Sequence, residues 1–358
     1  MKYLIISFII SFLTNLLLTK ASKRITKLIT DHLHEGPQKF HERPTPRLGG
    51  VGIFLGFISV YIFIALNKPD ISHYFLLFLI SSIPVFLAGL LEDITRSIPP
   101  KTRLFLISIS GVLVFFLLKA NITKTDISIL NNLLHIKIIS FLFTVFAVAG
   151  LTNAINIIDG FNGLASGVSL MIFIAIGYVA FENKDVLVLN LAMAIVGGII
   201  GFMLLNYPYG LIFLGDGGAY FLGFSIAVLS ILLVQRNHQV SPWFPVTIAI
   251  YPIYETLFSI YRRKFLKNTS PFKPDSMHLH TLFYKIITKK LIKKHDKVYR
   301  NPLTSLSVWL INLPFISIAS LYWNNSLLLI ILDLIFILFY SYVYLYILKS
   351  KLPKNMLK

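Results

Sequence analysis

The chain has 358 residues, of which 56% are hydrophobic and 13% are charged. Soluble domains carry about 25% charged residues, so this composition argues against a soluble protein and indicates a membrane protein. The net charge of +18 would be typical of nucleic-acid binding in a soluble chain, so the distribution of the charges decides their meaning. The absence of cysteine excludes disulfides, thiolate nucleophiles and cysteine-ligated metal sites.

Apolar runs long enough to cross a ~30 Å hydrocarbon core predict an all-α polytopic membrane protein with about eleven transmembrane helices. The predicted spans are residues 3–19, 48–67, 74–91, 104–119, 138–157, 163–181, 186–205, 218–235, 242–261, 304–322 and 325–348. The first is interpreted as a retained helix, because no small-x-small cleavage site precedes the basic residues that follow it. We expect residues 1–358 to form a single integral membrane domain.

The basic residues are distributed unevenly between the two sides of this topology. Most of the 33 Lys and Arg lie in residues 20–47, 92–103, 262–303 and 349–358. The exceptions are Lys2, Lys68, Lys119, Lys124, Lys137, Lys184 and Arg236. The positive-inside rule therefore predicts that the basic segments and the C-terminus are cytoplasmic and that the N-terminus is outside. The positive charge then reflects membrane topology, which disfavours nucleic acid as a partner.

Acidic residues recur at the predicted cytoplasmic ends of the spans, including the short loops at about 158–163 and 206–217. Glu92 and Asp93 end the third span, Asp159 ends the fifth, and Asp216 lies between the seventh and the eighth. Each carboxylate facing lipid at mid-bilayer would cost roughly 2.5–3.5 kcal/mol. We therefore expect them to line one wet cavity, where they repel one another unless a cation neutralises them. Oxygen ligands without thiols favour Mg²⁺.

The sequence NAINIIDGFNG at 153–163 separates two apolar runs and places polar residues at steps of three. Each step turns by about 60° on a helix, so Asn153 and Asn156 share a face that Asp159 borders. Gly160 is expected to end the helix and to let a ligand approach the backbone. The alternative is that the two asparagines only form hydrogen bonds with a neighbouring helix.

Further polar residues have two interpretations each. His278 and His280 resemble a fragment of a zinc site, but no cysteine completes it. Lys101 and Arg103 are candidate partners for phosphate, or they only follow the positive-inside rule. The role of Glu255, inside the ninth predicted span, stays open between pairing with a buried polar group and pairing with Arg262.

Five motifs, in this order, resemble those of the polyprenyl-phosphate N-acetylhexosamine-1-phosphate transferases. They are RPTPRLGG (43–50), EDIT (92–95), NAINIIDGFNGL (153–164), GDGG (215–218) and SPFKPDSMHLH (270–280). The resemblance covers about residues 40–285, and the eleven predicted spans look like the GlcNAc-1-phosphate branch. The family also includes the phospho-MurNAc-pentapeptide translocase and transferases that initiate O-antigen lipopolysaccharide and teichoic acid linkage units.

The resemblance implies a reaction. N-acetylhexosamine-1-phosphate would pass from a UDP-N-acetylhexosamine to polyprenyl (undecaprenyl) phosphate, with release of UMP, as the initiating step of a cell-surface glycan. Mg²⁺ is the implied cofactor, with Mn²⁺ as the alternative ion. The resemblance also implies a multi-pass protein of the bacterial inner membrane, in contact with the lipid bilayer, with a cytoplasmic active site and a homodimeric state.

The resemblance assigns roles to the residues already singled out. Catalytic roles fall on Glu92, Asp93, Asp159 and Asp216. Metal binding falls on Asp216, assisted by Asp93 or Asp159. Binding of the sugar nucleotide falls on Asn153, Asn156, His278 and His280, and Lys101 and Arg103 remain candidates for binding phosphate.

Three departures from the family pattern qualify these assignments. Glu92 replaces the first aspartate of the usual pair, and Arg96 stands where the third acid is common. The sequence His-Leu-His-Thr at 278–281 lacks the His triplet of the peptidoglycan enzyme, which disfavours a MurNAc-pentapeptide donor. Two alternative functions are kept open, a secondary transporter that uses membrane carboxylates and an inactive scaffold of the same fold.

Overall fold

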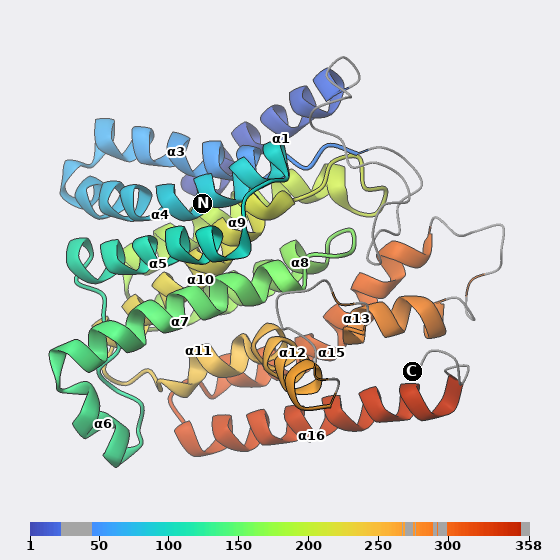
Figure 1. The fold of residues 1–358 in the computed structure, drawn as a ribbon. Helices are drawn as coiled ribbons and strands as arrows, with labels where there is room; N and C mark the ends of the chain where they lie inside the picture. Colours follow the sequence, from blue (N-terminus) through green and yellow to red (C-terminus); the bar gives the residue numbers. More distant parts are fainter. Residues whose placement is uncertain are drawn as a thin grey trace.

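The computed structural model describes residues 1–22, 45–266, 268, 275, 277–288, 292 and 299–351, and long helices dominate it (Figure 1). The helices are α1 (Lys2–Ser22), α3 (Gly49–Asn67), α4 (Pro69–Thr95), α5 (Pro100–Leu117), α6 (Ser128–Leu134), α7 (Lys137–Ile157), α8 (Leu164–Glu182), α9 (Val186–Asn206), α10 (Gly215–Arg236), α11 (Trp243–Ile248), α12 (Ile250–Tyr261), α13 (Leu279–Leu282), α15 (Arg300–Leu321) and α16 (Ser326–Lys351). Two short π-helical turns, η1 (Arg262–Leu266) and η2 (Phe283–Thr288), follow α12 and α13. Much of the predicted loops at 20–47 and 262–303 lies outside the described residues.

Within the described part of the chain, ten helices are long and apolar enough to cross a membrane, which confirms the predicted all-helical membrane fold. The ninth predicted span, residues 242–261, is instead two short helices that meet at Ala249. Pro252 has no N–H to donate to the Ile248 carbonyl, so one continuous helix would lose that hydrogen bond. In the first turn of α12 a missing N–H costs nothing, because the first-turn N–H groups have no partner within the helix.

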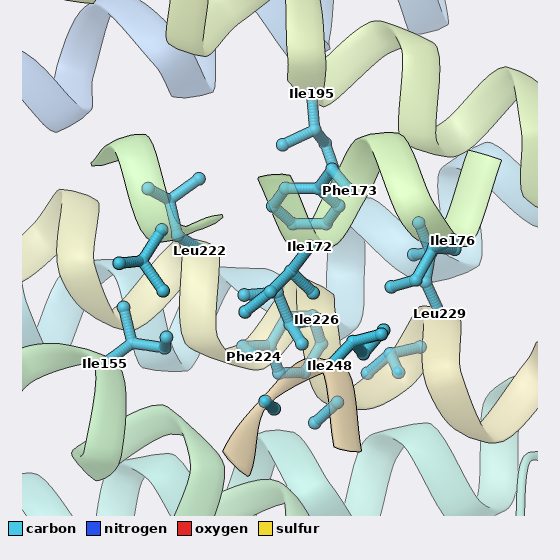
Figure 2. Close-up of a cluster of buried hydrophobic side chains, with 14 of the residues drawn as sticks. Ile155, Ile172, Phe173, Ile176, Ile195, Leu222, Phe224, Ile226, Leu229 and Ile248 are labelled. Atoms are coloured by element: carbon cyan, nitrogen blue, oxygen red, sulfur yellow. The ribbon is translucent and has the colours of Figure 1, made fainter. Parts of the chain in front are cut away.

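Helix α10 is the centre of the bundle. Every residue from Gly215 to Leu233 is buried, and α10 contacts α3, α4, α7 and α8. Figure 2 shows a cluster of buried hydrophobic side chains in this packing, contributed by several helices. They include Ile155 of α7, Ile172, Phe173 and Ile176 of α8, Ile195 of α9, Leu222, Phe224, Ile226 and Leu229 of α10, and Ile248 of α11. Within a bilayer, this close packing is a main source of helix association.

The peripheral helices present large apolar side chains outward. Phe146 of α7 is 71% exposed, Leu338 of α16 70%, Leu17 of α1 67% and Phe105 of α5 65%. Soluble proteins rarely expose contiguous apolar patches beyond a few hundred Å². The described helices therefore have the lipid-facing surface that their hydropathy predicts.

Glycines allow three helices to meet closely at the start of α10. The Gly50 N–H donates a hydrogen bond of 2.8 Å to the Leu214 carbonyl. A Cβ on Gly89 of α4 would lie 2.3 Å from the Gly217 nitrogen, so any side chain there would push α4 away from α10. The first turn of α10 is thereby held between α3 and α4.

In Figure 1, α6 and α13 lie at opposite ends of the bundle.

Candidate active site

Asp93 joins the end of α4 to the start of α10. Its Oδ1 accepts a hydrogen bond from the Asp216 N–H and its Oδ2 accepts one from the Gly217 N–H, both at 2.9 Å. The Asp93 residue is only 2% exposed. A carboxylate at a helix N-terminus satisfies N–H groups that have no partner within the helix and interacts favourably with the helix dipole. Asp93 therefore fixes the position of Asp216.

Asp216 is surrounded by positive and polar groups from three other segments. Its Oδ1 accepts hydrogen bonds from Nη2 of Arg47 at 3.0 Å and from Nδ2 of Asn156 at 3.1 Å. Its Oδ2 accepts one from Nη1 of Arg103 at 2.9 Å. Residues far apart in the sequence thus converge on one carboxylate, as the predicted topology requires. We name Asp93, Asp216, Arg47, Arg103 and Asn156 the Asp216 cluster.

Glu92 lies at the edge of the Asp216 cluster. Its Oε2 accepts a hydrogen bond of 2.8 Å from the Ile98 N–H, and its Oε1 lies 4.0 Å from Nη1 of Arg103. Glu92 therefore stabilises the turn between α4 and α5 and adds a weak ion pair to Arg103. Lys101, two residues before Arg103 in the sequence, is exposed and makes no hydrogen bond or ion pair with the described residues.

Asp159 follows the end of α7, in the loop at 158–163. Burial raises the pKa of Asp159 to about 7, an effect that the Arg47 guanidinium opposes and the negative charge of Asp216 reinforces. Its carboxylate makes no hydrogen bond with any residue that the structure describes. Asp159 is thus a partly buried anion close to a second anion, an arrangement that favours binding of a cation or a proton.

The loop at 158–163 is held by asparagines from other elements. The Asn162 N–H donates to Oδ1 of Asn301 at 2.7 Å, and the Gly163 N–H donates to Oδ1 of Asn206 at 2.6 Å. Nδ2 of Asn162 donates to the Pro208 carbonyl at 2.9 Å. These bonds attach the loop to the segment that precedes α10, so Asp159 and Asp216 stay on the same end of the bundle.

The polar residues of NAINIIDGFNG therefore have different partners. Asn156 joins the Asp216 cluster, whereas Nδ2 of Asn153 donates to the Ala149 carbonyl one turn earlier in the same helix, at 2.9 Å. In the described structure no hydrogen bond connects Asn153 with the Asp216 cluster. Asn156 and Asp159 thus both interact with Asp216, whereas the helical spacing alone does not show that Asn153 bonds within its own helix.

The two predicted histidines lie in a second buried group around Glu255. Nδ1 of His278 lies 2.9 Å from Oε1 of Glu255, and Nδ1 of His280 lies 3.1 Å from the Tyr251 hydroxyl. The Tyr340 hydroxyl donates to Oε2 of Glu255 at 2.8 Å. Glu255 therefore pairs with a buried histidine, while Arg262 forms an ion pair with Asp275. We name Tyr251, Glu255, His278, His280 and Asp275 the histidine cluster.

The loop at 158–163 lies between the two clusters. A Cβ on Gly160 would lie 3.7 Å from Nε2 of His280, and the Phe161 ring packs edge-on against the His280 ring with centroids 5.7 Å apart. The same loop carries Asp159, which is close enough to Arg47 and Asp216 to interact electrostatically. The clusters therefore border one region at the same end of the bundle.

The described residues contain no group of three or more His, Asp or Glu side chains that could enclose a metal ion by themselves. Two carboxylates, those of Asp216 and Asp159, are nevertheless close enough for their charges to interact. The Asp159 carboxylate makes no hydrogen bond with the described residues, and the Asp216 oxygens are bonded to side chains, which a bound ligand can displace. Mg²⁺ is commonly held by one or two carboxylates together with substrate phosphates. The donor set therefore fits a Mg²⁺ ion that a phosphate ligand helps to hold.

Comparison with known proteins supports the membership that the motifs indicate. The profile described as "Glycosyl transferase family 4" matches residues 75–234. The "Probable undecaprenyl-phosphate N-acetylglucosaminyl 1-phosphate transferase" of Bacillus subtilis (strain 168) is 30% identical over 285 residues, which are 77% of this chain and 76% of the relative.

Two further relatives represent the two branches. The "Undecaprenyl-phosphate alpha-N-acetylglucosaminyl 1-phosphate transferase" of Thermotoga maritima is 32% identical over 252 residues, 70% of this chain and 72% of the relative. The "Phospho-N-acetylmuramoyl-pentapeptide-transferase" of Streptococcus sanguinis is 26% identical over 265 residues, 71% of this chain and 79% of the relative. The similarity thus includes transferases that differ in the sugar named.

Proposed function

The chain belongs to glycosyl transferase family 4, and we propose that it transfers N-acetylhexosamine-1-phosphate from a UDP-sugar to undecaprenyl phosphate, releasing UMP. The family membership makes it a transferase enzyme. The ten long apolar helices in the described part of the chain make it a membrane protein. The names of the relatives support undecaprenyl phosphate as the acceptor. The initiating role in cell-wall biogenesis is part of the proposal.

One observation carries the proposal most strongly. Asp216 lies between Arg47 and Arg103, with nitrogen–oxygen distances of 3.0 and 2.9 Å, at the N-terminus of a central helix. Phosphoryl transfer depends mainly on positioning and on neutralising charge on phosphate oxygens. Two guanidinium groups with planar N–H donors beside a carboxylate supply both anion and cation binding in one place.

We assign Mg²⁺ binding to Asp216 and Asp159, with Mn²⁺ as the alternative ion. A divalent ion bound there would supply charge neutralisation for the donor diphosphate. Both oxygens of Asp93 accept backbone N–H groups, which cannot be released without disturbing the first turn of α10. The partners of Asp216 are side chains, so we assign Asp93 to positioning Asp216 instead of to ligation. Arg47 and Arg103 are assigned to binding phosphate oxygens, and Glu92 to orienting Arg103.

The remaining parts of the proposal concern donor, location and assembly. We propose a UDP-N-acetylhexosamine donor that contacts Asn156 and the histidine cluster. The distribution of basic residues supports an active site on the cytoplasmic face of the bacterial inner membrane, with the N-terminus outside. A homodimer is proposed from the family resemblance alone.

The proposal is tested with purified protein, undecaprenyl phosphate and a panel of UDP-GlcNAc, UDP-GalNAc and UDP-MurNAc-pentapeptide, with Mg²⁺ or with EDTA. We expect release of UMP that needs both Mg²⁺ and the lipid phosphate, with a UDP-N-acetylhexosamine preferred over the pentapeptide donor. A secondary transporter or an inactive scaffold would release no UMP from any donor. That outcome would reject the proposed function.

A further inference from the structure

Tyr251 and Glu255 lie one helical turn apart on α12 and each contacts a different histidine. The Tyr251 hydroxyl is 3.1 Å from Nδ1 of His280, and Oε1 of Glu255 is 2.9 Å from Nδ1 of His278. Residues four apart on a helix are neighbours on one face, so a single short helix supports both imidazoles. The two rings are stacked, with centroids 5.2 Å apart and an interplanar angle of 10°.

His278 has anionic neighbours at both ring nitrogens. Besides the contact with Glu255, its Nε2 lies 3.9 Å from Oδ2 of Asp275. The Leu279 N–H, next in the chain, also donates to Glu255, with a distance of 3.2 Å to Oε2. The His278 residue is 5% exposed. His278 is therefore surrounded by its own protein partners, which is the environment of a structural residue.

His280 differs from His278 at its second nitrogen. Nε2 of His280 makes no hydrogen bond with the described residues. This nitrogen faces Gly160, because it is the atom nearest to a Cβ built on that glycine. Burial lowers the pKa of His280 to about 3, so its imidazole is neutral at physiological pH. A neutral imidazole has one donor nitrogen and one acceptor nitrogen.

The Tyr251 hydroxyl determines which nitrogen is the donor. Tyr251 is 1% exposed, and Nδ1 of His280 is its only hydrogen-bond partner among the described residues. A buried hydroxyl that donates no hydrogen bond costs about 1–3 kcal/mol. The O–H of Tyr251 is therefore expected to donate to Nδ1, which leaves the hydrogen of His280 on Nε2, facing the loop that carries Asp159.

We propose that Tyr251 is a positioning residue that holds His280 as the Nε2–H tautomer, so that His280 donates a hydrogen bond to an oxygen of the donor diphosphate while His278 supports the cluster. The inference rests on the proposed function, because it takes the sugar nucleotide as the ligand. The sequence motif assigns binding of the sugar nucleotide to both histidines, whereas this inference gives it to His280 and gives His278 a structural role. It also adds Tyr251, which belongs to no motif in the sequence.

The test compares Tyr251→Phe with Tyr254→Phe, which removes a hydroxyl from the same helix that bonds Ser341 at 2.8 Å instead of a histidine. We expect Tyr251→Phe to lower kcat/KM by roughly tenfold, as the loss of about 1.4 kcal/mol predicts, and Tyr254→Phe to change it by less than about twofold. Imidazole ¹⁵N NMR should show His280 as Nε2–H in the wild type and as a tautomer mixture in Tyr251→Phe.

A double-mutant cycle separates positioning from a general structural effect. His280→Gln keeps an N–H near the position of Nε2 but has no Nδ1, so adding Tyr251→Phe to it should cause little further loss. Full additivity, equal losses in the two tyrosine variants, or an Nδ1–H tautomer in the wild type would each overturn the inference. If the wild type released no UMP, the proposed function and the substrate contact would both fail, while the NMR spectra would still decide the Tyr251 contact.

Discussion

The carboxylate of Asp93 and the backbone N–H of Asp216 are joined by a hydrogen bond of 2.9 Å, although 123 residues separate them in the sequence. The bond attaches the first turn of α10 to the end of α4. Because the same carboxylate also accepts the Gly217 N–H, the direction of the Asp216 side chain is fixed by backbone bonds. The Asp216 cluster is therefore organised by the protein itself, before any phosphate ligand binds.

Replacement of Asp93 by Asn should damage stability and activity together. The amide oxygen can accept one of the two N–H groups, but the amide nitrogen would face the other and leave it unsatisfied. We expect the free energy of unfolding to fall by about 1–3 kcal/mol, and turnover to fall by at least tenfold because Asp216 is displaced. Thermal unfolding in detergent and UMP release measure the two effects. Wild-type stability in Asp93→Asn would contradict the assigned capping role.

Arg103 and Lys101 are both candidates from the sequence, and the structure distinguishes them. Arg103 contacts Asp216 at 2.9 Å, whereas Lys101 is exposed and makes no hydrogen bond or ion pair with the described residues. We expect Arg103→Gln to lower kcat/KM by about 10- to 100-fold, in the range of one charge-assisted hydrogen bond, ~1.5–3 kcal/mol. Lys101→Gln should cost less than twofold. Equal losses would mean that general positive charge, and not the Arg103 contact, supports the reaction.

Gly160 offers a way to block His280 without removing it. The methyl group of Gly160→Ala would lie 3.7 Å from Nε2 of His280, an ordinary van der Waals contact that the fold tolerates. We therefore expect nearly unchanged thermal stability, but a weaker affinity for the UDP-sugar, because the methyl group screens Nε2. Isothermal titration with UDP-GlcNAc and a melting curve test this. Unchanged affinity would show that Nε2 does not face the ligand.

The pKa of Asp159 predicts a pH-dependent stability in metal-free buffer. Burial raises this pKa to about 7 from an ordinary value of 3.8, so the folded state binds the proton more tightly than the unfolded state. The associated stabilisation is present at acidic pH and is lost as the pH rises through about 7. In EDTA, the melting temperature should fall by a few degrees, roughly the effect of ~1 kcal/mol, between pH 5.5 and pH 8.

Asp159→Asn is the matched control, because it keeps the shape of the side chain and removes its titration. The fall in melting temperature between pH 5.5 and pH 8 should be smaller in this variant than in the wild type. Parallel curves for the two proteins would show that Asp159 does not titrate in this range.

Hydropathy predicts most of the fold, because each span is a local property of about twenty residues. The exception is residues 242–261, which are less uniformly apolar because they contain Pro245, Pro252 and Glu255. The position of a helix break there depends on where the hydrogen bond lost at Pro252 is tolerated. The convergence of Asp93, Asp159 and Asp216 at one end was also predictable, since span counting assigns each loop to a side. The sequence did not predict which of them touch, namely that Asp93 bonds the backbone N–H of Asp216 and that Asp159 interacts with Asp216 through its charge.

The partners in the two clusters could not be predicted from local pattern. Arg47 lies in the motif RPTPRLGG, but the motif does not name its partner, and only the distance of 3.0 Å to Asp216 identifies it. The sequence did not decide whether Glu255 pairs with a buried polar group or with Arg262. Its pairing with His278 depends on how α12 packs against the segment before α13. Asn153 lies in the NAINIIDGFNGL motif, but its amide bonds the Ala149 carbonyl of its own helix.

Participation of Asp216 in the reaction is tested by undecaprenyl-phosphate-dependent UMP release in Asp216→Asn and Asp185→Asn. Asp185 is a matched control, since it is also a buried carboxylate, paired with Arg236 at 2.8 Å, but it lies at the start of α9, away from the Asp216 cluster. We expect the Mg²⁺-dependent rate to fall at least 100-fold in Asp216→Asn and to stay within about twofold of the wild type in Asp185→Asn. A near-wild-type rate in Asp216→Asn, or equal losses in both variants, would exclude a direct role of Asp216.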